Sequence, residues 1–203
     1  MGTLHRIAGN TMNREESSVF THNEALYSTL EKLYLEETGD PSSSQISCII
    51  KRANLPTPVL LGGIYLAIVA REKAAVHMEA LRKEILRDPL GKELLQKRLD
   101  AAIQLCGSST ALFSVSLIIS SKYLVDRAYV NRTWSNILMM DKLTINEYER
   151  TLLSIFEHKV DITERSIMSV VERLKRNTMA ISKKEGKLSK LLRKITSCLF
   201  SKK

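Results

Sequence analysis

The sequence has few of the residues that build cross-linked or turn-rich folds. Its 203 residues include 8 glycines, 4 prolines and 3 cysteines, and aromatic residues make up 5%. The number of cysteines is odd, so they cannot all pair with one another. Cys48, Cys106 and Cys198 also lie far apart and lack the CxxC or Cys/His spacing of a zinc site. This excludes a disulfide scaffold and favours a reducing compartment. Because turn residues and aromatics are scarce, we expect an all-α protein rather than a β-sandwich or β-barrel.

Long apolar segments are also missing. The longest apolar run, Val59–Ala70, has 12 residues, whereas a membrane-spanning helix needs about 20. The polar N-terminal residues contain no apolar core of the kind found in a signal peptide. We therefore expect an intracellular protein of the nucleus or cytoplasm that is neither secreted nor membrane-spanning.

The signatures of common enzymes do not occur. The sequence contains no GxxxxGK, GxGxxG, HExxH or GxSxG pattern. Its four histidines, His5, His22, His77 and His158, are scattered, and none has the spacing of a metal ligand. We therefore predict that the chain is not an enzyme and holds neither a metal ion nor a cofactor.

The sequence is 44% hydrophobic, and along most of it the apolar residues recur at helical intervals. A capping box of Thr21 and Glu24 predicts a helix that ends at the turn-forming residues 38–41. The next predicted helix has Ile46, Ile49, Ile50 and Ala53 on one face.

The next segment, which begins at Thr57, is predicted to form the central helix of the fold. Thr57 is expected as an N-cap, with Pro58 in the first turn. Val59–Ala70 is apolar on every side, which is typical of a helix surrounded by others. Gly62 and Gly63 each cost about 1 kcal/mol relative to alanine in a helix, so we expect them where another helix packs closely.

The rest of the chain predicts further helices. After residues 71–88, which are charged and amphipathic, come an amphipathic helix ending at Gly107 and an apolar helix capped by Ser108 or Ser109. We then expect a loop at 126–131 and a short helix at 133–140. Two more helices follow, one opened by a Thr144–Glu147 capping box and one beginning at Thr163.

The excess of positive charge is confined to the C-terminal tail. Residues 173–203 contain 11 Lys or Arg and 1 acidic residue, whereas the other 172 residues have a net charge of −1. Residues 183–199 have the pattern of a basic amphipathic helix. This helix fits an anionic membrane surface, with Cys198 as an acylation site. It equally fits a nuclear-import or nucleic-acid patch, or a solvated helix without a partner.

Two charged residues occupy positions where the helical pattern predicts apolar ones. Lys122 ends the apolar stripe of its helix, and Glu149 lies beside Tyr148 and Leu152. One interpretation is that the Lys122 stem lies along the core while Glu149 flanks it. The other is that both side chains form directional hydrogen bonds to a partner.

The region 44–163 resembles a cyclin box, most closely that of the single-box fungal and protist cyclins of the phosphate-signalling and PCL type (P/U-type). The third helix of those cyclins ends in a small-small-Lys-Phe/Tyr-Leu pattern, which Ser120–Leu124 matches. Their next loop and their fifth helix have further motif positions. In this sequence they are Asp126, Tyr129, Asn131 and Trp134 in the loop, and Asn146, Glu149 and Leu153 in the helix.

The resemblance implies a fold, a partner and a site. The fold is a five-helix cyclin box over 42–163 with an insertion at about 71–106. An N-terminal extension (1–41) containing one helix precedes it, and a C-terminal helix with the basic tail (164–203) follows. The partner is a cyclin-dependent protein kinase, whose activity and substrate choice the chain would regulate. In cyclins a lysine and a glutamate at the positions of Lys122 and Glu149 bind the kinase backbone, which favours the partner interpretation of these two charges.

Two other functions stay open at this point. A cyclin-fold transcription or nucleic-acid-binding factor is disfavoured by the neutral body, because such binding needs basic residues on the fold itself. A helical membrane-surface adaptor would act through weak contacts of the tail at 173–203.

Overall fold

The computed structural model of the chain describes residues 27–28, 30–32, 34 and 43–181. The described residues are helices and short connections without any β-strand, which confirms the all-α prediction. Residues 27–34 are helical where they are described. They are followed by α2 (Ser43–Ala53), α3 (Thr57–Arg87), α4 (Lys92–Gly107), α5 (Ser109–Leu124), α6 (Asn131–Leu138), α7 (Lys142–Ile155) and α8 (Glu164–Ile181).

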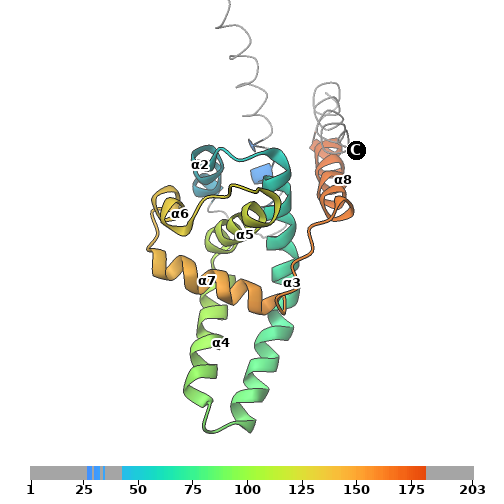
Figure 1. Cartoon of the computed structure of the whole chain (residues 1–203). Helices are drawn as coiled ribbons and strands as arrows, with labels where there is room; N and C mark the ends of the chain where they lie inside the picture. Colours follow the sequence, from blue (N-terminus) through green and yellow to red (C-terminus); the bar gives the residue numbers. More distant parts are fainter. Residues whose placement is uncertain (1–26, 29, 33, 35–42, 182–203) are drawn as a thin grey trace, which may run out of the picture.

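Helix α5 lies at the centre of the bundle, in contact with α2, α3, α4 and α7 (Figure 1). Every residue from Ala111 to Ser121 is buried. The sequence predicted a single apolar stripe on this helix, but neighbouring helices cover all its sides. Buried serines such as Ser116 and Ser120 make this possible, because small side chains let adjacent helices approach.

The first half of α3 packs tightly against α5, as its glycines predicted. A Cβ atom added at Gly63 would lie 3.1 Å from Leu117 Cα, and Ser120 Oγ donates a 2.8 Å hydrogen bond to the Val59 carbonyl. The predicted cap of this helix is wrong by one residue. Pro56 is the N-cap, Thr57 is already helical, and no side chain caps the helix.

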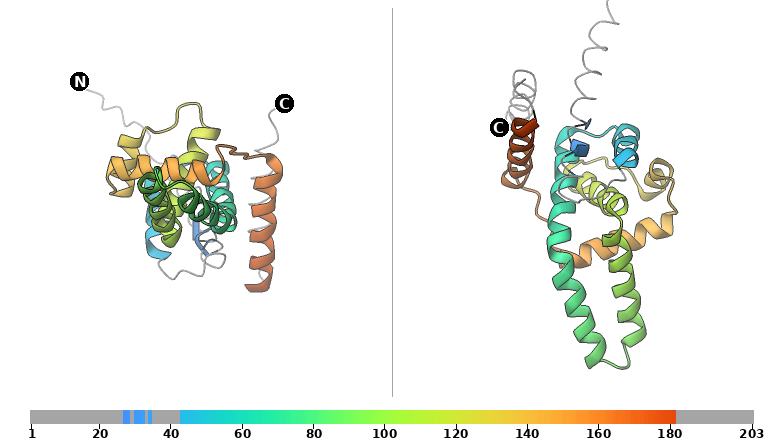
Figure 2. Two further views of the ribbon diagram at one scale, coloured as in Figure 1. Left: turned by 90° about the horizontal axis from the view of Figure 1, so that it is seen from below. Right: turned by 180° about the vertical axis from the view of Figure 1, so that it is seen from behind.

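The second half of α3 and α4 form an antiparallel hairpin that projects from the bundle (Figures 1 and 2). It has a small apolar cluster of its own, in which Leu81, Leu95 and Leu99 are buried. This hairpin contains the residues 71–106 that the sequence analysis treated as an insertion. Among the described residues no single helix is long and apolar enough to cross a membrane. Only α4 and α5 taken together are long and apolar enough, and they are bent by 100° to each other.

The connections around α6 and α7 differ from the sequence prediction. Helix α6 begins at Asn131, two residues early, and Met139 ends it in the left-handed conformation (φ 54°). Helix α7 begins at Lys142, because Asp141 and not Thr144 is its N-cap: the carboxylate of Asp141 accepts from the backbone N–H groups of Leu143 and Thr144. The predicted Thr144–Glu147 capping box is therefore wrong.

The two ends of the described chain are attached to the bundle differently. Tyr34 is fully buried, and its hydroxyl donates a 2.8 Å hydrogen bond to the Ser109 carbonyl. Helix α8 packs Val170 and Val171 into the main core beside α3. It begins at Glu164, one residue after the predicted start, and the side chain of the preceding Thr163 accepts from the Ser166 backbone N–H. The Thr21 capping box, the turn at 38–41 and tail residues 182–203 lie outside the described residues.

Candidate functional site

Lys122 and Glu149, the two charges that interrupt apolar faces, form an ion pair. Lys122 lies in the last turn of α5 and Glu149 in the middle of α7. Their Nζ and Oε1 atoms are 2.5 Å apart, although 27 residues separate them in the sequence. The crossing of α5 and α7 thus brings together the two site residues that the sequence analysis selected.

An asparagine holds the other side of the Glu149 carboxylate. Asn131 Nδ2, at the start of α6, donates to Glu149 Oε2 and to Asn146 Oδ1, both at 2.7 Å. Asn146 and Glu149 are three residues apart and so share a face of α7. This network fixes the orientation of the Asn131 amide, since the reverse orientation would point its oxygen at the carboxylate. Three helices therefore position Glu149.

The two members of the pair differ in their access to a partner. The Glu149 side chain is 13% exposed and both its oxygens already accept hydrogen bonds, whereas Lys122 is 37% exposed. An ammonium group has three donors, and within the described part of the chain Lys122 uses one, toward Glu149. Lys122 thus presents free donors at the surface, while Glu149 holds the ammonium group in place.

Exposed large hydrophobic residues are frequent in the part of the sequence that runs from Lys122 toward Glu149. Of the eleven large hydrophobic residues that are exposed in the described chain, six lie between positions 123 and 143. Tyr123 and Leu124 directly follow Lys122, and Tyr129 and Val130 directly precede Asn131; the others are Met139 and Leu143. Exposed apolar residues around a fixed polar group are typical of a protein–protein interface. We call these six residues, with Lys122 and Glu149, the ion-pair surface.

Two members of the network had no role predicted from the sequence. Asn131 and Asn146 appeared in it as motif positions, and no function was given to either. The three-residue spacing of Asn146 and Glu149 was the available signal. The contact of Asn131 with both was not accessible from the sequence, because it depends on how α6 packs against α7.

Comparison with protein-family models, with curated proteins and with solved structures found no match for this chain. The ion-pair surface contains a fixed donor and apolar side chains, groups that are common at protein–protein interfaces. Among the described residues no cluster of three His, Cys, Asp or Glu is placed to hold a metal ion.

Proposed function

We propose that this chain is the regulatory subunit of a cyclin-dependent protein kinase and binds the kinase through the ion-pair surface. The observation that carries the proposal is the Lys122–Glu149 pair, because it lies on the apolar surface of a helical bundle at the two positions that the cyclin resemblance selects.

The arrangement of the motif residues supports the proposal. Lys122 ends the buried central helix, Trp134 is buried in the short helix after the loop, and Glu149 lies in the next helix. A paired lysine of this kind has donors left for main-chain carbonyl groups of a partner. The surrounding apolar side chains supply contact area, and the partially buried carboxylate limits the positions that the lysine can adopt.

The proposed mechanism is allosteric. A protein kinase needs its Lys–Glu ion pair and its metal-binding aspartate in place before it transfers a phosphoryl group. A subunit that binds only the conformation with the αC helix in place shifts the kinase population toward that conformation. The catalytic residues then belong to the kinase, and this chain contributes binding free energy alone.

The first test is affinity purification of the full chain from its native extract, followed by identification of the stoichiometric partner and assay of its kinase activity. We expect a protein kinase that is recovered with the wild type and lost with Lys122→Ala/Glu149→Ala. The matched control is Glu157→Ala/Lys159→Ala, which removes another lysine–glutamate pair (3.4 Å) whose side chains are largely exposed to solvent.

A structural effect and a binding effect are distinguished by Lys122→Arg. This variant keeps the charge and the pair with Glu149 but changes the donor geometry toward a partner. We expect it to fold as the wild type does and to bind the kinase more weakly. Recovery of no kinase with the wild-type chain, or equal recovery with the alanine pair, would refute the proposed function.

A further inference from the structure

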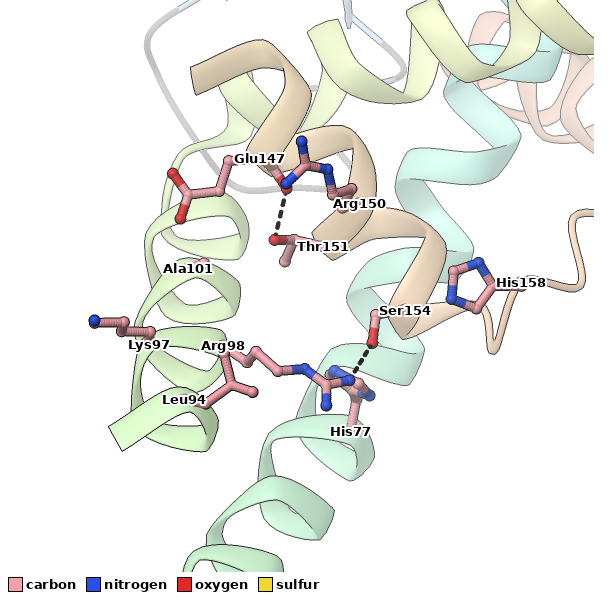
Figure 3. Close-up of a pocket in the computed structure, with 10 residues that line it drawn as sticks. All are labelled: His77, Leu94, Lys97, Arg98, Ala101, Glu147, Arg150, Thr151, Ser154 and His158. Carbon is pink, nitrogen blue, oxygen red and sulfur yellow. Dashed lines mark hydrogen bonds between the residues drawn. The ribbon is translucent and has the colours of Figure 1, made fainter. Parts of the chain in front are cut away.

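A pocket of about 500 Å³ lies between α4 and α7, with α3 forming one side (Figure 3). Its volume falls within the range of about 300–1,000 Å³ that is common for small-molecule sites. The pocket lies at the base of the α3–α4 hairpin and shares no residue with the ion-pair surface. Its lining residues are His77, Leu94, Lys97, Arg98, Ala101, Glu147, Arg150, Thr151, Ser154 and His158.

The lining is predominantly basic. It contains three fixed cations and one carboxylate, so its formal charge is +2 with both imidazoles neutral. Lys97 is partly compensated by Glu93 outside the pocket, at 2.8 Å. By contrast, no carboxylate of the described chain lies within 4.0 Å of the guanidinium groups of Arg98 or Arg150. These two arginines therefore keep their charge available for an anion.

Arg98 is held across the pocket. It extends from α4 toward α7, where its Nη2 donates a 3.2 Å hydrogen bond to Ser154 Oγ, and it lies beside His77 (Figure 3). A guanidinium group has five N–H donors in a planar fork, and this contact uses one of them. Because the Ser154 hydroxyl accepts that bond, its own hydrogen is free to donate. Arg98 and Ser154 thus present several donors on neighbouring helices.

The neighbouring histidine responds to the same positive charge. Burial lowers the pKa of His77 below its usual value of 6.5, and the nearby Arg98 lowers it further, while Glu157 acts in the opposite direction. An anion bound beside Arg98 would oppose both effects, since it stabilises a charged imidazole. The electrostatic surroundings of His77 therefore agree with the charge of the lining.

We propose that this pocket binds a phosphomonoester group, with Arg98 as its principal ligand and Ser154 as a second donor. A phosphomonoester carries a charge of about −1.5 to −2 at pH 7, which matches the lining better than a carboxylate does. Its oxygen atoms also fit the planar donor fork of an arginine. Arg150 and Lys97 strengthen the attraction from the rim, and Glu147 opposes it from one end.

The proposal is tested on the full chain by calorimetric titration with three probes: inorganic phosphate, glycerol 3-phosphate, and a phosphoserine peptide beside its unphosphorylated form. We expect saturable binding of at least one phosphorylated probe and none of the unphosphorylated peptide. Glycerol 3-phosphate and the phosphopeptide distinguish a small metabolite from a phosphorylated protein as the source of the group.

Substitutions then locate the binding. Arg98→Gln is expected to weaken binding roughly tenfold or more, as loss of a charge-assisted hydrogen bond does, and Arg98→Lys by less. The matched control is Arg87→Gln, which removes an exposed arginine from the same hairpin outside the pocket. Ser154→Ala provides a second, uncharged variant, and circular dichroism checks that each variant is folded.

Two results would overturn the proposal. One is the absence of saturable binding for every phosphorylated probe. The other is equal weakening by Arg98→Gln and Arg87→Gln, which would mean that net charge and not the pocket attracts the anion. The test involves no kinase, so its outcome is independent of the proposed function.

Discussion

The contact between α3 and α5 leaves no space for a methyl group at Gly62. A Cβ atom there would lie 2.5 Å from Ser120 Oγ, the hydroxyl that donates to the Val59 carbonyl. The next nearest atoms, in Ile162 and Leu124, are 3.3 Å away and belong to side-chain ends that can shift slightly. Gly62→Ala must therefore either rotate Ser120 out of its hydrogen bond or separate the two helices.

The size of this effect follows from three contributions. Alanine stabilises a helix by about 1 kcal/mol relative to glycine. Overpacking costs about 1–3 kcal/mol, and the loss of the Ser120 hydrogen bond costs about 1 kcal/mol. We therefore expect Gly62→Ala to lower the free energy of unfolding by about 1–3 kcal/mol. Ser120→Ala alone should lower it by about 1 kcal/mol.

The double variant Gly62→Ala/Ser120→Ala should be nearly as stable as the wild type. Without the hydroxyl there is no clash, and the gain from replacing glycine offsets the lost hydrogen bond. Urea denaturation of the four proteins gives the coupling free energy between the two positions, which we expect to be about 2–4 kcal/mol. Additive effects of the two substitutions would refute this account of the helix contact.

Three further predictions use the same denaturation assay. Asp141→Ala should lower the free energy of unfolding by about 1 kcal/mol through loss of an N-cap, whereas Thr144→Ala should change it little. A larger loss of stability with Thr144→Ala than with Asp141→Ala would contradict the cap assignment. Tyr34→Phe should cost about 1 kcal/mol by removing a buried hydrogen bond, and an unchanged stability would show that this contact contributes nothing. The free energy of unfolding should fall as the pH drops below 6.5. Burial and Arg98 lower the pKa of His77 in the folded protein, so the unfolded chain binds the proton first. His77→Gln should make this pH dependence weaker, and an unchanged slope would contradict the assignment.

Features that depend on residues close together in the sequence could be predicted from it. Val59–Ala70 is apolar on all sides, so its central position followed from burial alone, and Gly62 and Gly63 indicated the close helix contact. The helix starts were less predictable. Asp141 and Thr144 are both good capping residues, and only the path of the chain after Met139 decides that Asp141 caps α7.

Features that join distant segments could not be obtained from helical periodicity. Lys122 and Glu149 were selected because they interrupt apolar faces and because of a family resemblance, but their contact requires α5 and α7 to cross. The pocket was missed entirely. His77 and His158 were treated as isolated residues, yet the α3–α4 hairpin and α7 place both on the lining of one cavity.

Binding of a protein kinase to the ion-pair surface can be measured as the dissociation constant of the purified chain for the kinase recovered with it. Lys122→Ala/Glu149→Ala should weaken binding by about 2 kcal/mol or more, roughly 30-fold. The control Glu157→Ala/Lys159→Ala should bind as the wild type does. If the two double variants bind the kinase with the same affinity, the ion pair belongs to the fold alone and the assigned binding surface is wrong.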